Sequence, residues 1–302
     1  RLAQDIVPLL NADIDVANCD SYDLSCQTSS IQLFLSHSWA TPGWLKTLSL
    51  RYTLCLWPAL IMGGTVSLIM NVVEVFIWPI PYTGVCELPM GDTTVGFHLT
   101  YGWCLGLPVV ALVFFYGEHF CFDKTCFLDR ACIHQEDPAL KQKGIRALGD
   151  TLQSSERMLI FWQPLYFTRL WCGFELAAYI KRKGGRSITL NPLNHVTFTL
   201  SIMVFHIVAV IGVSLAAPFL ICSPSFASWL VHHVPNHCLQ MLVMFACLWV
   251  MLGVIYAFPS PFVFKFLWTC VDDRRTLKKQ ICSYSIEACN CTEESDRHFV
   301  YG

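Results

Sequence analysis

The chain has 302 residues, of which 54% are hydrophobic and 14% are charged, with a formal net charge of -2 at pH 7. A composition this apolar excludes an ordinary soluble protein and predicts membrane-spanning segments, so the lipid bilayer is an expected partner. The charged residues form no basic patch with interleaved aromatic residues, which argues against a nucleic-acid partner.

The chain opens with a polar segment, residues 1–28, that has neither an initiator methionine nor a signal peptide. The chain also ends without a recognisable terminating signal, so it is expected to be a fragment of a longer protein. Residues 29–52 then begin a folded domain. Within them, the run at residues 31–35 predicts a buried strand and residues 44–51 predict a short helix.

Residues 53–116 are predicted to form a transmembrane hairpin. Its two apolar windows, residues 53–78 and 95–116, contain no Lys or Arg, and each approaches the ~20 residues that cross a bilayer. The ends of a helical hairpin lie close together on one side of the membrane, so such a hairpin can interrupt a domain at little cost.

Residues 117–193 are predicted to complete the domain. The expected elements are strands at 125–129, 157–161 and 187–190 and helices at 138–154 and 167–183. Asp137 followed by Pro138 is a good N-terminal cap for the first of these helices. Alternating strands and helices are typical of a parallel α/β sheet, in which strands 31–35 and 125–129 are expected to be neighbours.

Residues 194–266 are predicted to form a second transmembrane hairpin, with apolar windows at 197–222 and 238–262. Residues 267–302 form a tail that is expected to begin as a helix along the membrane surface. Two arrangements of the domain remain open: the sheet has four strands, or the tail covers its edge.

The positions of the basic residues predict the topology. All 20 Lys and Arg residues lie before residue 53, between residues 117 and 186, or after residue 264. The positive-inside rule then places the domain and both termini on the cytosolic side of a multipass protein with four spans. The sequence does not identify the membrane.

Two sequence motifs follow predicted strands. Residues 34–39 read Phe-Leu-Ser-His-Ser-Trp, and residues 166–176 read Tyr-Phe-Thr-Arg-Leu-Trp-Cys-Gly-Phe-Glu-Leu. Together with Phe-Leu-Asp at 127–129 and the run at 154–161, these motifs resemble the Toll/interleukin-1 receptor (TIR) domain family. The resemblance implies a flavodoxin-like (TIR-like) parallel sheet, here split by a transmembrane hairpin.

Glu175 is the expected catalytic residue. Trp171 and Glu175 lie four residues apart, so on a helix they share a face beyond the carboxyl end of a strand, where open α/β sheets bind ligands. In TIR domains that hydrolyse NAD, this glutamate engages the nicotinamide ribose. The resemblance therefore implies that Glu175 cleaves the nicotinamide–ribose bond, with Trp171 beside the substrate.

Ser36, His37, Ser38 and Trp39 are expected to line the same cleft. Their hydroxyl and imidazole groups suit hydrogen bonds to a ribose or phosphate, and the indole suits stacking on a base. An alternative is that Ser36 and Ser38 only satisfy backbone groups of the turn. Asp129, at a strand end, contacts ligand or a partner, or else pairs with a nearby cation, Arg130 or Lys124.

The histidine and cysteine residues between positions 119 and 134 lack the paired spacing of a zinc site. No metal or resident cofactor is therefore expected, and NAD enters only as a possible substrate.

The predicted function is that of a membrane-anchored TIR-like signalling protein acting as an NAD nucleosidase. One alternative is a non-catalytic scaffold that recruits other TIR-like domains or associates with itself. A second is a transporter or channel with a regulatory TIR-like domain, although its spans would carry few ionisable residues, namely Glu74, His98 and His206.

Overall fold

The computed structural model describes residues 22, 25–77, 86–90, 93–97, 102–120, 124–221, 223–234, 236–285, 287–291, 297 and 300. The predicted segment 1–28 and His98 lie mostly or wholly outside the described residues. The chain divides into two compact units. The α/β unit comprises Arg1–Pro58, Val113–Thr197 and Thr269–Gly302, and the helical unit comprises Ala59–Leu112 and Phe198–Trp268.

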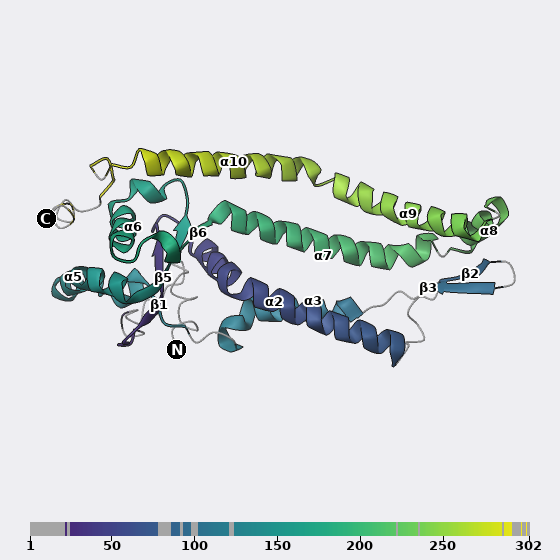
Figure 1. Cartoon of the computed structure of the whole chain (residues 1–302), viewed down its shortest axis with the longest axis horizontal. Coiled ribbons are helices and arrows are strands. Elements are labelled where there is room, and N and C mark those ends of the chain that lie inside the picture. The colour runs from purple at the N-terminus through teal and green to yellow at the C-terminus, as the bar shows by residue number, and fades with distance from the viewer. Residues whose placement is uncertain are drawn as a thin grey trace. The chain divides into compact units, whose positions relative to one another are not determined.

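A four-stranded parallel sheet forms the centre of the α/β unit (Figure 1). Its strands are β1 (Ile31–His37), β4 (Cys126–Phe127), β5 (Ser155–Trp162) and β6 (Ile188–Pro192), in the order β4-β1-β5-β6. Phe34 of β1 pairs with Phe127 on one side and with Met158 on the other. The predicted parallel α/β sheet is therefore confirmed, and so is the adjacency of its first two strands.

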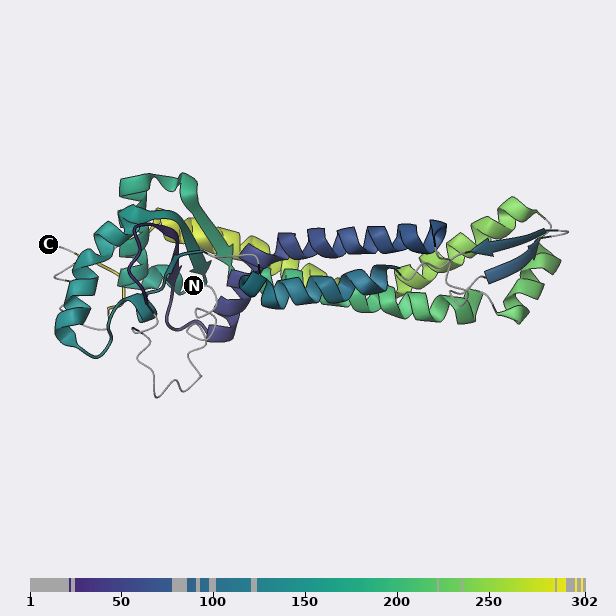
Figure 2. The same cartoon turned by 90° about the horizontal axis from the view of Figure 1, so that it is seen from below.

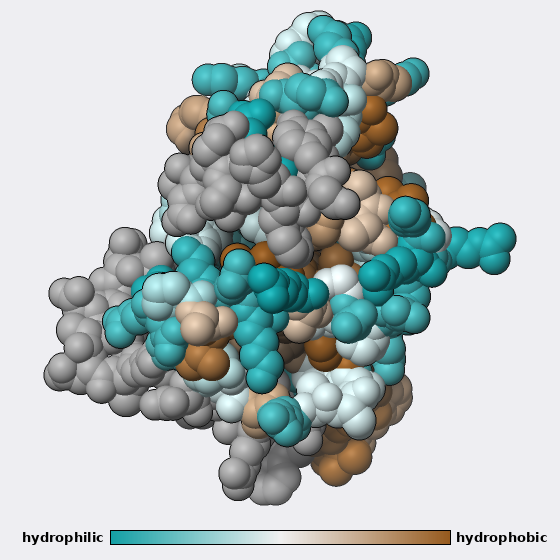
Figure 3. All heavy atoms as spheres, turned by 90° about the vertical axis from the view of Figure 1, so that its left-hand side faces the viewer, coloured by the Kyte–Doolittle hydropathy of each residue, from teal (hydrophilic) through white to brown (hydrophobic). Residues whose placement is uncertain are grey.

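Alternate strand residues face two separate hydrophobic clusters, as the two-residue period of a strand requires. Leu33 and Leu35 pack with Leu45 and Leu50 at the start of helix α2 (Gly43–Phe76). On the opposite face, Phe34 joins residues of helices α5 (Pro138–Ser154) and α6 (Leu170–Lys183). Helices therefore cover both faces of the sheet. On the one face that Figure 3 shows, hydrophilic side chains project from this unit among apolar ones.

Helix α5 has the predicted bounds. The Asp137 carboxylate caps it by accepting hydrogen bonds from the backbone N–H groups of Ala139 and Leu140. A 3-10 turn, η2 (Tyr166–Thr168), precedes α6, so the helix begins later than predicted.

The predicted strand at 125–129 is wrong at its end. The strand stops at Phe127, and Asp129 begins the short helix α4 (Asp129–Cys132). The N–H groups of Ala131 and Cys132 donate to the Leu128 carbonyl at 3.0 and 2.8 Å, which turns the chain away from the sheet.

Helices α2 and α3 (Gly102–Phe120) extend into the helical unit, and strands β2 (Cys86–Met90) and β3 (Thr93–Phe97) come between them in the sequence (Figure 2). The predicted window 95–116 is therefore wrong at its beginning, because residues 93–97 pair antiparallel with β2. The remaining helices are α7 (Leu193–Ile221), α8 (Pro224–His233), α9 (His237–Ala257) and α10 (Ser260–Cys282).

Two helical stretches among the described residues are long and apolar enough to cross a membrane. They are Gly43–Phe76 and Cys238–Ala257, and only 17% and 13% of their most apolar windows are buried. A core helix of a soluble protein would be mostly buried. Two shorter apolar helical stretches, Leu105–Gly117 and Leu193–Ala209, overlap the other two predicted spans.

The C-terminal tail belongs to the α/β unit. Gln280 donates a side-chain hydrogen bond to the Pro164 carbonyl at 2.5 Å, and the backbone of Asn290 bonds with that of Leu170. Among the described residues the sheet has four strands. The tail packs on the turn before α6 rather than extending the sheet.

Candidate functional site

A cavity of about 480 Å³ lies within the α/β unit, where β1 and β4 end and α6 begins. Ligands of open α/β sheets bind at this carboxyl edge of the strands. The cavity lining includes six of the residues selected from the sequence, namely His37, Ser38, Trp39, Asp129, Trp171 and Glu175. Ser36, the seventh, contacts Glu175 directly.

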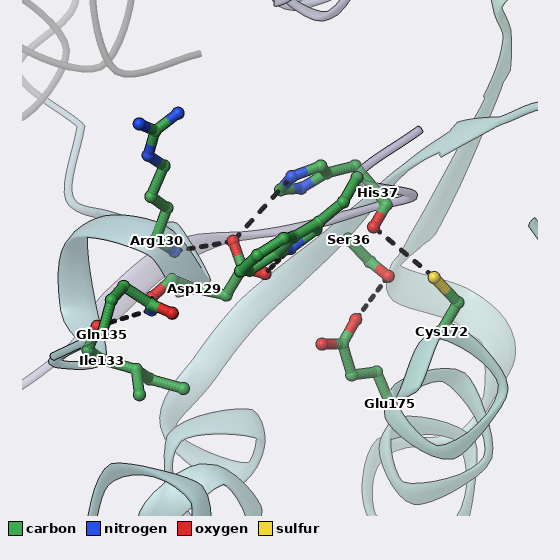
Figure 4. A network of polar contacts seen from close by, with 9 residues as sticks. Ser36, His37, Asp129, Arg130, Ile133, Gln135, Cys172 and Glu175 are labelled. Carbon is green, nitrogen blue, oxygen red and sulfur yellow. Dashed lines mark hydrogen bonds and ion pairs between the residues drawn. The ribbon is translucent and has the colours of Figure 1, made fainter. Parts of the chain in front are cut away.

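Glu175 is held by a hydrogen bond from β1. Ser36 Oγ donates to Glu175 Oε2 at 2.6 Å, and Figure 4 shows the two side chains pointing toward each other. Burial raises the pKa of Glu175 to about 8, the hydrogen bond from Ser36 opposes this rise, and the charge of Asp129 adds to it. At pH 7 this carboxyl group is therefore mostly protonated.

Tyr166 completes this contact and was not selected as a site residue from the sequence. Its Oη donates to Ser36 Oγ at 2.6 Å and lies 3.3 Å from the Cys172 carbonyl oxygen. The side chain is fully buried, and burial raises the pKa of Tyr166 well above its usual value. The sequence feature that could have identified Tyr166 is its position as the first residue of the second motif.

Asp129 is bound on both carboxylate oxygens. Trp39 Nε1–H donates to Oδ2 at 2.6 Å, and the backbone N–H of Arg130 donates to Oδ1 at 2.7 Å. His37 Nε2 lies 3.8 Å from Oδ1 (Figure 4). Asp129 thus contacts the backbone N–H of Arg130, and its carboxylate orients the indole of Trp39 and the imidazole of His37 at the cavity.

His37 and Ser38 carry buried polar atoms that face the site. Their exposed fractions are 8% and 1%, and neither His37 Nδ1 nor Ser38 Oγ has a hydrogen-bond partner among the described residues. Burial lowers the pKa of His37. The charge of Asp129 opposes this change and the charge of Lys46 adds to it, so the imidazole ring is neutral at pH 7. A buried polar atom without a partner costs roughly 1–3 kcal/mol, which favours a ligand role here.

The hydroxyl groups of Ser36 and Ser38 do not satisfy backbone groups of the turn, which was the alternative role expected for them. Ser36 Oγ bonds to the side chains of Tyr166 and Glu175, and Ser38 Oγ has no bond to the backbone of the described turn. Neither hydroxyl is therefore used by the turn itself.

Trp171 and Cys172 line the cavity from the first turn of α6. The Trp171 ring meets Phe174 edge to face, with centroids 5.8 Å apart. The Cys172 thiol donates to the His37 carbonyl at 3.5 Å. Burial raises the pKa of Cys172 well above its usual value, so this thiol is a poor nucleophile.

No protein-family model, curated protein or solved structure matches this chain. Within the described part of the chain, no three His, Cys, Asp or Glu residues are grouped to hold a metal ion. Arg169, Asn290 and Cys291 also line the cavity, and neither sequence motif predicted them as site residues. Asn290 and Cys291 come from the C-terminal tail.

Proposed function

We propose that this chain is a membrane-anchored signalling protein whose TIR-like α/β unit cleaves NAD at the nicotinamide–ribose bond. The observation that carries this proposal is the position of Glu175 in a cavity shared with His37, Ser38, Trp39 and Trp171. The strand order β4-β1-β5-β6 supports it, because it matches the first four strands of the flavodoxin-like order 2-1-3-4-5.

Glu175 supplies the charge that the reaction requires. The bond between the ribose C1′ and nicotinamide breaks, its electron pair leaves with nicotinamide, and positive charge grows on the ribose. The carboxylate stabilises this charge and then takes a proton from the water that attacks C1′. The cationic nicotinamide ring favours the ionised carboxylate, so substrate binding lowers the pKa of Glu175 from about 8.

The other cavity residues position the substrate. His37 Nδ1 and Ser38 Oγ are available for ribose hydroxyl groups, since neither has a partner among the described residues. Trp39 is 59% exposed and offers an aromatic face for a base.

The helical unit supports membrane anchoring through its close helix contact. A methyl group added to Gly63 of α2 would lie 2.8 Å from the Gly106 carbonyl oxygen, and one added to Gly106 would lie 2.5 Å from that of Gly63. Close approach at small residues is typical of transmembrane helix pairs. The one-sided placement of Lys and Arg favours four spans with the α/β unit and both termini in the cytosol.

Nicotinamide release by the full chain in lipid nanodiscs tests the enzyme proposal. Wild-type protein should release nicotinamide from NAD, and Glu175→Gln should reduce the rate about 10²- to 10³-fold because it removes the stabilising charge. Glu156→Gln, at an exposed position of β5, is the matched control and should retain the rate. Equal rates for wild type and Glu175→Gln would contradict the proposal.

A scaffold without catalysis is the second candidate function. The hydrogen bond from Ser36 to Glu175 joins β1 to α6, which gives the carboxyl group a structural use. In this case the domain self-associates or recruits TIR-like partners, and the nanodisc protein releases no nicotinamide.

A further inference from the structure

We propose that Arg169 and Asn290 form an oxyanion subsite in the cavity, which binds a phosphate group of the substrate. The identity of that substrate rests on the proposed function, but binding of the anion does not require Glu175. The subsite is built partly from the C-terminal tail, which lies outside both sequence motifs.

Backbone hydrogen bonds place the two side chains together. The Asn290 N–H donates to the Thr168 carbonyl at 2.6 Å, and the Leu170 N–H donates to the Asn290 carbonyl at 3.1 Å. These bonds make Arg169 and Asn290 partners in a parallel bridge. Residues paired in this way carry their side chains on the same face, and both residues line the cavity.

The tail is fixed on both sides of Asn290. The Tyr284 ring meets Phe167 with centroids 6.0 Å apart, and Tyr284 Oη occupies the space that a side chain at Gly173 would need. Cys289 is 2% exposed, and its carbonyl accepts a hydrogen bond from Arg297 at 2.9 Å. Asn290 is therefore flanked by packed residues on both sides and can serve as a defined ligand contact.

The chemistry of this pair suits an oxyanion. A guanidinium group donates in a planar fork and a carboxamide adds two donors, and neither side chain has a hydrogen bond or ion pair to a described residue. The pair stands at the N-terminal end of α6, where the first turn contains no acidic residue and no side chain caps the helix. The positive end of the helix dipole favours an anion at this place.

The rest of the cavity is compatible with a phosphate group. Lys141 contributes a further positive charge to the lining, whereas Asp129 is already bound by Trp39 and Arg130. The unpartnered, buried atoms of His37 and Ser38 line the same cavity and independently indicate a polar ligand. The expected substrates are thus phosphorylated N-ribosides, and the unphosphorylated nucleoside should be a poor substrate.

Pyrophosphate binding to the full chain tests the subsite without catalysis. In nanodiscs of zwitterionic lipid, calorimetric titration with inorganic pyrophosphate should show saturable binding to the wild type. Arg169→Gln and Asn290→Asp should each weaken it about tenfold or more, as expected for a lost charge-assisted hydrogen bond. Arg169→Lys should restore part of the affinity, and Arg186→Gln, at an exposed arginine, should have no effect.

Absence of saturable pyrophosphate binding to the wild type would by itself overturn the proposal. A loss of affinity in Arg186→Gln equal to that in Arg169→Gln would also overturn it. Glu175→Gln should still bind pyrophosphate, so failure of the subsite and failure of NAD cleavage are distinguishable. ADP-ribose should compete with pyrophosphate. If anionic lipid in the nanodiscs competes and ADP-ribose does not, the subsite binds a lipid headgroup and its assignment to substrate is wrong.

Discussion

Helix α2 contributes to both units, and its two parts differ in what surrounds their apolar side chains. In the α/β unit Leu45 and Leu50 are 8% and 4% exposed, whereas in the helical unit Leu68 and Phe76 are 65% and 79% exposed. Exposed apolar surface on this scale is unfavourable in water. One continuous helix thus joins a part stabilised by protein packing to a part that the proposed bilayer would surround.

The largest expected effect is a cavity in the sheet. Leu159 of β5 is fully buried, so Leu159→Ala should lower the free energy of unfolding by about 2–5 kcal/mol through lost burial and an unfilled cavity. Leu68→Ala is the matched change in the helical unit and should cost much less, because the Leu68 side chain is 65% exposed. Chemical denaturation in detergent measures both, and equal losses would break the comparison.

Arginine substitutions at two exposed leucines test whether lipid or water surrounds each of them. Leu68→Arg should disfavour membrane insertion by about 2.5–3.5 kcal/mol, the cost of arginine near the centre of a span. Leu140→Arg, at an exposed leucine of α5 (39% exposed), should leave folding and insertion unchanged. A translocon insertion assay reports the first, and normal insertion of Leu68→Arg would refute a lipid environment for α2.

The α5 cap provides a smaller effect that is confined to the α/β unit. Asp137→Ala removes the acceptor for two backbone N–H groups and should cost about 1 kcal/mol. Asp150→Ala, at a residue whose side chain is 90% exposed, should cost less. Thermal melting of the two variants gives the difference, and a larger loss for Asp150→Ala would contradict the assigned cap.

The last expected effect is a pH dependence from Glu175. Its pKa is about 8 in the folded protein against an ordinary value of 4.5, so folding retains a proton that the unfolded chain releases. The associated stabilisation is complete below the ordinary pKa and is lost as pH rises to about 8.

Glu175→Gln cannot ionise and does not lose this contribution. Its melting temperature relative to wild type should therefore rise between about pH 5 and pH 8 and then level off. A difference that does not vary with pH would show that burial leaves the carboxyl group unperturbed.

The sequence predicted those features that depend on local signals. Asp137 and Pro138 identified the start of α5, and the carboxyl ends of parallel strands were sufficient to group His37, Asp129 and Glu175. Asn290 could not be predicted, because its backbone bonds to Thr168 and Leu170 follow from tail packing without a motif. Asp129 was misplaced because the Ala131 and Cys132 N–H groups bond to the Leu128 carbonyl, which ends the strand and starts α4 at Asp129.

The central claim is that the chain divides between water and lipid, with the α/β unit in the cytosol. Cys238 in the helical unit and Cys282 in the α/β unit are both exposed, and the proposed topology places them on opposite faces of the membrane. Sealed vesicles with the cytosolic face inward are treated from outside with a membrane-impermeant maleimide. Mass spectrometry of the labelled peptides then compares Cys238 with Cys282 directly. The account predicts that Cys238 is labelled and that Cys282 is labelled only after permeabilisation, and labelling of intact vesicles at Cys282 with protection of Cys238 would contradict it.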